Sequence, residues 1–292
     1  MGVLLGLAAA VLYGTTDFAG GLLSRRSGSP LAVLVSGSLA STALAWALLA
    51  VVGGQPPDPR VIGFGLAGGV ASGIGTIALY RGLARGRMSV VGPVSAVGAA
   101  VLPVIVGVAT GERPNPLALL GVIAALPAIA LVAGAGADGS DDVPADGIEK
   151  TGKKIKRGSG LTDGLIAGIA FGVMFVALAR TGGRTGLWPL AFEQTGALVV
   201  VLAMAVITRT SLRQSLRDRV ASVLDEVGAL IATLLYYLAT HAGMLSTVAV
   251  VTSLYPGVTV LLAYVITRER ISPAQRTGLG LCALAVVAIA AG

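Results

Sequence analysis

Charge is the scarcest feature of this sequence. Only 12% of the 292 residues are charged, whereas about 25% is usual in a soluble domain. The few charges gather in short polar segments, which are separated by apolar runs. These runs have about twenty residues each, enough for an α-helix to cross roughly 30 Å of hydrocarbon. The scarcity of charge therefore excludes an ordinary soluble domain and predicts a membrane protein.

Cysteine and histidine are almost absent as well. The chain has one cysteine, Cys282, and one histidine, His241. A single cysteine excludes disulfides within the chain and a cysteine-built metal site. The sequence lacks an Asp-rich metal motif, a Ser-His or Cys-His pair, an HExxH motif and a nucleotide P-loop. We therefore predict no enzyme activity, no metal and no cofactor, and we expect a gradient rather than ATP hydrolysis to drive any transport.

The short alternating segments of a membrane β-barrel are missing too. Backbone groups in lipid must be satisfied internally, so the apolar runs are predicted to be helices. The first run lacks a charged flank and a cleavage site, and is interpreted as a retained helix rather than a signal peptide. Ten helices are predicted, at about 3–23, 31–52, 61–83, 90–109, 116–136, 163–180, 187–208, 222–242, 246–266 and 272–291.

One polar phrase occurs twice. The segment "GVATGERPNP" at 107–116 returns as "YVITRERISP" at 264–273. A shift of 157 residues aligns Thr110, Glu112, Arg113 and Pro116 with Thr267, Glu269, Arg270 and Pro273. Four such matches within a few positions mean more than matches among abundant Gly, Ala and Val. We predict two copies of one five-helix unit, at 1–136 and 163–292.

The odd number of helices in each copy sets the geometry. After five crossings the chain emerges on the opposite side of the membrane, so the second copy enters upside down. Such inverted repeats recur in secondary transporters, where the two halves expose one central site to each side in turn. The predicted fold class is an all-α integral membrane protein with ten transmembrane helices in two inverted five-helix repeats.

The segment between the copies, 137–162, is polar and rich in glycine. Its first half is acidic and its second half basic. It cannot bury apolar area, so we predict a disordered linker loop. A regulatory role of the basic half, or its binding of lipid headgroups, is the alternative.

The ends of the two copies carry a resemblance. "GERPNPLALLGVIAALPAIALVAG" and "RERISPAQRTGLGLCALAVVAIAAG" each place an acidic residue before a glycine-containing helix, Glu112 with Gly121 and Glu269 with Gly278. In this the chain resembles the drug/metabolite transporter (DMT) superfamily, and within it the EamA-type ten-helix permeases.

The resemblance implies a secondary-active permease that moves small polar metabolites by alternating access. Amino acids or related compounds are the expected substrates, export is the expected direction, and the cell (plasma) membrane is the expected location. A flippase for lipid-linked sugars and a multidrug exporter are the alternatives. The expected partners are a small-molecule substrate, the lipid bilayer and protons as coupling ion, without nucleic acid, and the chain is expected to be a monomer or homodimer.

Carboxylates inside apolar runs are the main candidates for a substrate or proton cavity. Asp17 lies in the first predicted helix and Glu193 in the seventh. A charge in hydrocarbon costs at least ~2.5 kcal/mol, so it persists mainly where it has a partner or a task. We expect these groups to pair with a cationic substrate or carry a coupling proton. Asp225 and Glu226 lie near the start of the eighth run, where reaching interfacial water is the stronger interpretation.

Tyrosines inside the runs have a polar tip and are expected to line the same cavity, with packing between helices as the alternative. They are Tyr13, Tyr80, Tyr237 and Tyr255. Pro93, Pro103 and Pro256 fall within the fourth and ninth runs. Because proline removes a helical hydrogen bond, we predict hinges there.

The repeated charged residues have two interpretations. Glu112, Arg113, Glu269 and Arg270 could act as a gate, or could belong to helix caps and interfacial anchors. Asn115 and Ser272 precede Pro116 and Pro273, which suits an N-cap followed by proline at the first helical position.

Orientation is left open by two conflicting signals. All of the 21 Lys and Arg residues except Arg60, Arg113, Arg180 and Arg184 fall in segments that follow odd-numbered helices. The positive-inside rule places these segments in the cytoplasm and both termini outside. The family that the chain resembles is usually described with both termini inside.

Overall fold

The computed structural model describes residues 1–27, 29–53, 57–84, 88–134, 160–182, 186–267 and 272–291. Throughout these ranges the regular elements are helices. They are α1 (Gly2–Ser27), α2 (Pro30–Val52), α3 (Pro59–Ala84), α4 (Met88–Ala109), α5 (Pro116–Gly134), α6 (Gly160–Ala179), α7 (Trp188–Ile207), α8 (Leu216–His241), α9 (Leu245–Thr252), α10 (Tyr255–Leu262), the π-helical turn η1 (Ala263–Thr267) and α11 (Pro273–Ala291).

Each predicted apolar run is a helix, and only the ninth run is divided, into α9, α10 and η1. Within the described residues, 7 helical segments are long and apolar enough to cross a membrane, and shorter apolar helices occupy Val94–Ala109, Pro116–Ile129 and Arg276–Ile289. The predicted all-α membrane fold is therefore confirmed.

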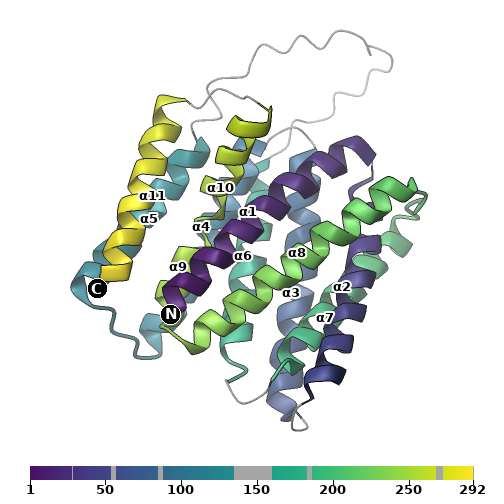
Figure 1. Ribbon diagram of the computed structural model, residues 1–292, viewed down its shortest axis with the longest axis horizontal. Coiled ribbons are helices and arrows are strands. Elements are labelled where there is room, and N and C mark those ends of the chain that lie inside the picture. Colours follow the sequence, from purple (N-terminus) through teal and green to yellow (C-terminus); the bar gives the residue numbers. More distant parts are fainter. Residues whose placement is uncertain are drawn as a thin grey trace.

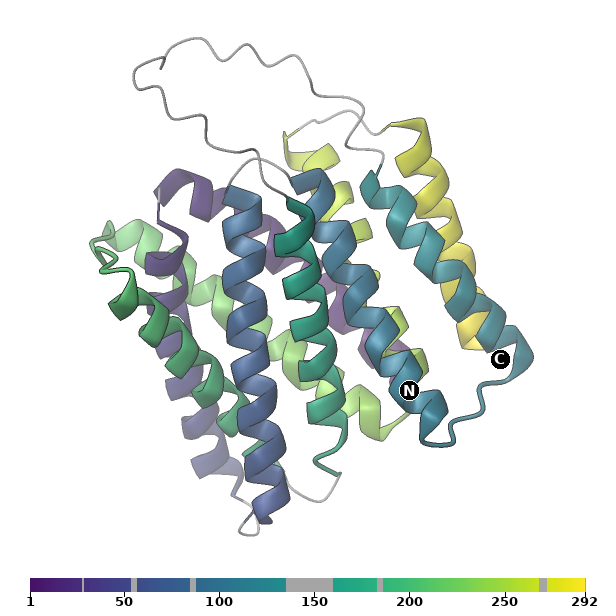
Figure 2. The same ribbon diagram turned by 180° about the vertical axis from the view of Figure 1, so that it is seen from behind.

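The two halves interlock so that each encloses a helix of the other. Figure 1 shows α1 lying between α8 and the α9–α10 pair, and the reverse view in Figure 2 shows α6 between α3 and α4. These two arrangements are equivalent when the halves are exchanged, because α1 corresponds to α6, α3 to α8 and α4 to α9. The same exchange maps α5 onto α11, and these two helices pack against each other at one edge of the molecule (Figure 1).

The ends of the chain agree with this arrangement. The first turn of α1 and the last turn of α11 lie at the same end of the molecule (Figure 1). An even number of crossings is required to return the chain to its starting side. Since each half has five, the second half runs through the membrane in the opposite sense to the first.

Glycine brings helices of the two halves into backbone contact. A Cβ atom built on Gly98 of α4 would lie 2.8 Å from the Cα atom of Gly168 in α6, closer than real Cβ contacts allow. Gly69 of α3 and Gly196 of α7 form a second such contact. Side chains at these positions would push the halves apart, so the glycines set the spacing of these two helix pairs.

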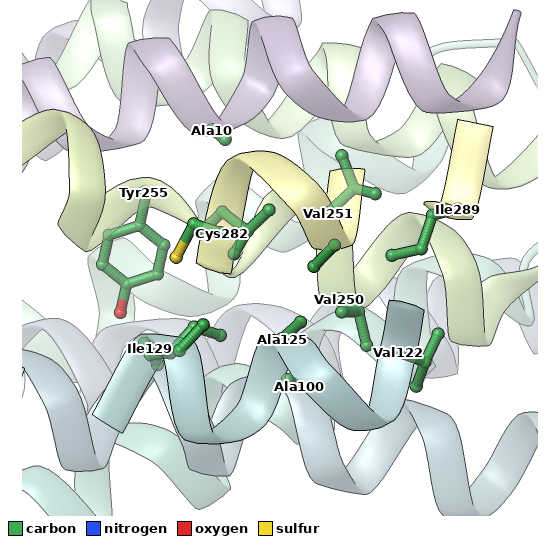
Figure 3. Close-up of a cluster of buried hydrophobic side chains, with 14 residues drawn as sticks. Ala10, Ala100, Val122, Ala125, Ile129, Val250, Val251, Tyr255, Cys282 and Ile289 are labelled. Carbon is green, nitrogen blue, oxygen red and sulfur yellow. The ribbon is translucent and has the colours of Figure 1, made fainter. Parts of the chain in front are cut away.

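Small side chains likewise hold the α5–α11 pair against the rest of the molecule. Figure 3 shows Ala100, Val122, Ala125 and Cys282 within one buried apolar cluster, to which α1, α4 and α9 also contribute. The cluster borders the polar cavity described below, because Tyr255 belongs to both.

One of the two equivalent helices in which proline predicted hinges is interrupted. The ninth run breaks after Thr252, and Pro256 occupies the second position of α10. Proline there cannot donate to the carbonyl of residue 252 and crowds it. In contrast, α4 continues through Pro93 and Pro103 without a break. The interruption is therefore confined to the second half, rather than shared by both halves.

Two boundaries need correction. The eighth helix begins at Leu216, earlier than predicted, because the Ser215 hydroxyl accepts a hydrogen bond from the backbone N–H of Asp218 at 3.1 Å and caps it. The sixth helix begins at Gly160, so residues 160–162 belong to it rather than to the predicted linker. The rest of that linker prediction falls outside the described residues, as do Glu269 and Arg270.

Candidate substrate cavity

A cavity lies between the two halves of the molecule. Its lining comes from α1, α2, α3 and α4 of the first half and from α6, α7, α8 and α10 of the second. Its empty volume is about 860 Å³, including the part open to solvent. Both halves of the molecule therefore contribute to one shared cavity.

The polar part of the lining is acidic. Carboxylates are contributed by Asp17 of α1, Glu193 of α7 and Glu226 of α8. Hydroxyl and amide groups add Tyr13, Thr16, Ser38, Ser72, Thr76, Tyr80, Gln194, Thr233 and Tyr255. Among the described residues, no Lys, Arg or His lines the cavity. Its electrostatic character is thus set by carboxylates without a protein cation to balance them.

Equivalent positions of the two halves face one another across the cavity. Gly14 aligns with Gly172 in the first helix of each half, so Tyr13 corresponds to Phe171 and Asp17 to Phe175. Both members of each pair line the cavity. The two-fold relation therefore passes through this space, but the chemistry differs, because an acid in one half is replaced by a phenyl ring in the other.

Glu193 is held in a buried network. It is 1% exposed, and its carboxylate accepts a hydrogen bond from Gln194 Nε2 at 2.9 Å. The Gln194 side chain accepts in turn from the Ser41 hydroxyl of α2 at 2.8 Å, and Thr42 donates to the Gln194 carbonyl at 3.1 Å. These partners are neutral. They fix the position of the Glu193 carboxylate without neutralising its charge.

Aromatic rings form the wall around Asp17. The Tyr13 hydroxyl lies 2.8 Å from Thr233 Oγ1 on α8, and its ring centre lies 6.3 Å from Phe175 and 6.5 Å from Tyr255. Asp17 follows Tyr13 by one helical turn and therefore lies on the same face of α1. The predicted positions of Tyr13, Asp17 and Tyr255 are brought together here.

Tyr80 reaches a carboxylate of the other half. Its hydroxyl donates a hydrogen bond to Asp225 Oδ2 at 2.8 Å, and both side chains are buried. A Cβ atom on Gly20 of α1 would overlap the Tyr80 hydroxyl, so glycine is needed where the three helices meet. The other Asp225 oxygen, Oδ1, is buried and has no hydrogen-bond partner.

The sequence led us to interpret Asp225 as a residue near a helix end that reaches interfacial water, and this interpretation does not fit the structure. The early start of α8 at Leu216 puts Asp225 more than two turns inside the helix. The signal that could have found it is the pattern Ser215-x-x-Asp218, which resembles a capping box and marks the true helix start.

Tyr237 does not line the cavity, contrary to the prediction. Its hydroxyl donates to the carbonyls of Gly182 at 3.3 Å and Gly186 at 3.2 Å, in the connection between α6 and α7. It occupies the position equivalent to Tyr80, yet it braces a turn while Tyr80 meets a carboxylate. Repeat symmetry therefore transfers the location of a side chain along its helix, but not its partner.

Glu112 acts as a helix cap between the halves. Its two carboxylate oxygens accept hydrogen bonds from the backbone N–H groups of Leu245 at 2.6 Å and Ser246 at 2.9 Å, the first residues of α9. Asn115 Oδ1 accepts from the Leu117 N–H at 2.9 Å and caps α5, as its sequence pattern suggested. Arg113 is exposed.

In the described residues, apolar helical segments in two interlocked, inverted halves surround a polar cavity, an architecture that recurs in multi-pass membrane transporters. The chain belongs to the EamA-like transporter family, whose sequence profile matches residues 1–134 and 158–291. A solved structure, described only as "Crystal structure of protein", has a similar fold with a TM-score of 0.73 at 17% identity, over 99% of this chain and 98% of that chain. Among curated proteins, none matches this chain.

Proposed function

We propose that this transporter is a secondary-active exporter of small amine-bearing metabolites, located in the plasma membrane and working by alternating access. One observation carries the proposal: the described lining of the cavity contains Asp17, Glu193 and Glu226 and no basic side chain. A substrate ammonium group supplies the missing positive charge and several hydrogen-bond donors.

The same lining discriminates between amines and amino acids. A substrate carboxylate would meet three carboxylates and would find only hydroxyl and amide donors, such as those of Gln194 and Thr76. Like charges in a poorly hydrated space repel strongly. The cavity therefore favours compounds that carry an amine without a free carboxylate, a class that excludes the free amino acids expected from the family resemblance.

The broken ninth helix supplies a point of movement beside the cavity. The two residues between α9 and α10 are followed directly by Tyr255, which lines the cavity, and by Pro256. A small rotation at this break would move the Tyr255 wall while α9 stays fixed by Glu112. Alternating access then needs no ATP, and a proton or substrate gradient drives it.

Transport of a small protonated amine tests the proposal. Proteoliposomes containing the protein, and protein-free liposomes as the control for diffusion of the neutral form, are loaded with buffer, exposed to labelled ethanolamine, and assayed with and without a pH gradient. We expect saturable uptake that excess unlabelled amines suppress and that small organic acids leave unchanged. Glu193→Gln should reduce this uptake, whereas Asp58→Asn, an exposed acid outside the cavity, should not. Equal suppression by organic acids would contradict the proposed substrate class.

A further inference from the structure

Four exposed arginines gather where α7 passes into α8, and we call them the arginine patch. They are Arg209, Arg213, Arg217 and Arg219. The one acid among them, Asp218, already accepts a hydrogen bond from the Ser215 hydroxyl at 2.6 Å and lies 3.5 Å from Arg26 of α1. The ion pairs found among the described residues include none of the four arginines. The patch therefore presents positive charge that the described part of the protein does not balance.

The backbone that carries the patch is held in place. Ser36 of α2 donates a hydrogen bond to the Gln214 side chain at 2.6 Å, which fixes the connection beside the start of α2. Arg209, just after the end of α7, has a left-handed φ of 48°, a conformation that favours glycine. Residues held in such conformations cluster at binding sites and other functional positions. The patch is thus preorganised, which lowers the entropic cost of binding a ligand.

An apolar stripe continues from the patch along α8. Leu216, Val220 and Leu224 follow one another at intervals of four residues and are 76%, 51% and 67% exposed. Residues four apart lie on one face of a helix. At 3.6 residues per turn this face is opposite Ser222 and Asp225, which are buried in the protein. The stripe therefore faces outward from the helices, toward lipid.

The length of α8 places the patch at the level of the lipid headgroups. The helix has 26 residues, or about 39 Å at 1.5 Å per residue, against roughly 30 Å of hydrocarbon. Arginine is costly in hydrocarbon, so the start of α8, which carries Arg217 and Arg219, lies outside it. Figures 1 and 2 both show the connection between α7 and α8 at the edge of the molecule away from α5 and α11. Lipid molecules can approach the patch from that side.

The equivalent connection of the first half has no such patch. Between α2 and the start of α3, its charged residues are Asp58 and Arg60, one of each sign. The patch is therefore not a feature that the repeat duplicates, and the first half offers a matched control for it.

We propose that the arginine patch binds the headgroup of an anionic phospholipid, whose acyl chains lie along Leu216, Val220 and Leu224. Guanidinium groups pair with phosphate oxygens in a bidentate manner. A zwitterionic phospholipid carries the same phosphate but also an ammonium group, which the remaining arginines repel. The exposed stripe favours a lipid over free phosphate, because only a ligand with acyl chains gains from it. This site is separate from the cavity and from its substrate.

Native mass spectrometry of the detergent-solubilised full chain tests the proposal. The probes are dioleoylphosphatidylglycerol, which is anionic, and dioleoylphosphatidylcholine, which is zwitterionic and has the same acyl chains. We expect the first phosphatidylglycerol to bind roughly tenfold more tightly than the first phosphatidylcholine, because each arginine near the membrane surface adds attraction to an anionic headgroup. Added salt should reduce this preference, since it screens exposed charges.

Variants locate the site. Arg213→Gln combined with Arg217→Gln should remove most of the preference for phosphatidylglycerol, whereas Arg60→Gln, in the equivalent connection of the first half, should keep it. Leu216→Ser should weaken the binding of both lipids alike, because it changes the surface under the acyl chains and leaves the charge intact. Unchanged size-exclusion profiles establish that the variants are folded. If the double variant misfolds, Arg213→Gln alone should show a smaller loss of the same kind.

Three results would overturn the proposal. They are equal binding of the two lipids by the wild type, a preference that survives the loss of both arginines, and displacement of phosphatidylglycerol by inorganic phosphate at millimolar concentration. The last result would identify a site for anions in general rather than for a lipid. None of these results depends on the transport of amines, so the proposed function is tested separately.

Discussion

Replacement of Glu112 by alanine should loosen the start of α9. The α9 helix has no capping side chain of its own, since Met244 at its N-cap makes no side-chain cap bond. Instead Glu112, from the other half, accepts hydrogen bonds from Leu245 and Ser246. The first N–H groups of a helix have no partner within it, and this carboxylate satisfies the first two of α9.

The magnitude follows from the two bonds. Hydrogen bonds to a charged group contribute about 1.5–3 kcal/mol net, and a negative charge at a helix N-terminus adds a further ~0.3–1 kcal/mol. Glu112 is half-buried, so in the variant the amides of Leu245 and Ser246 can bind water instead. We therefore take the total loss of stability at the start of α9 as about 2 kcal/mol. This equals roughly a 30-fold change in the opening equilibrium.

Hydrogen exchange followed by mass spectrometry gives the measurement. In Glu112→Ala the amides of Leu245 and Ser246 should exchange roughly 30-fold faster than in wild type, while Arg113→Ala, at the exposed neighbour, should leave them unchanged. Gly107→Ala should mimic Glu112→Ala, because its methyl group would overlap Glu112 Oε2. A change below about threefold in Glu112→Ala would refute the capping argument.

Two further predictions concern packing and orientation. Gly98→Ala should lower the melting temperature in detergent by several degrees, since overpacking costs about 1–3 kcal/mol; Gly92→Ala on the same helix, where a methyl group meets nothing within 4 Å, should not. In a Cys282→Ala background, which is free of cysteine, Ser211→Cys should react with an impermeant maleimide only from the cytoplasmic side and Arg113→Cys only from outside. The reverse labelling would place both termini in the cytoplasm.

The helices and their order were predictable because the signal is strong and local. A run of about twenty apolar residues has few alternatives in a membrane. The repeated segment around Glu112 then determined the inversion, by counting crossings. Two details of the helices were not predicted correctly. The cap at Ser215 extends α8 into a polar segment that hydropathy alone excludes. The prolines of α4 predicted a break there, but the break occurs only in the other half, at Pro256.

The cavity was predictable only in part, for a physical reason. Asp17, Glu193 and Tyr80 stand out because polar groups are costly in hydrocarbon, and all three line the cavity. Which partners they meet depends on contacts between helices far apart in sequence. The Tyr80 hydroxyl meets Asp225 across 145 positions, and the equivalent Tyr237 turns to a loop instead. No local pattern distinguishes these two tyrosines.

The two halves share their arrangement of helices but not the chemistry of the cavity lining. Packing pairs α6 with α3 and α4 as it pairs α1 with α8 and with α9 and α10, and α5 packs against α11. The lining is not symmetric, because Asp17 faces Phe175 at the equivalent position. The second half instead contributes its carboxylates from α7 and α8, through Glu193 and Glu226. The acidic lining is therefore drawn from both halves but from positions that the repeat does not relate to each other.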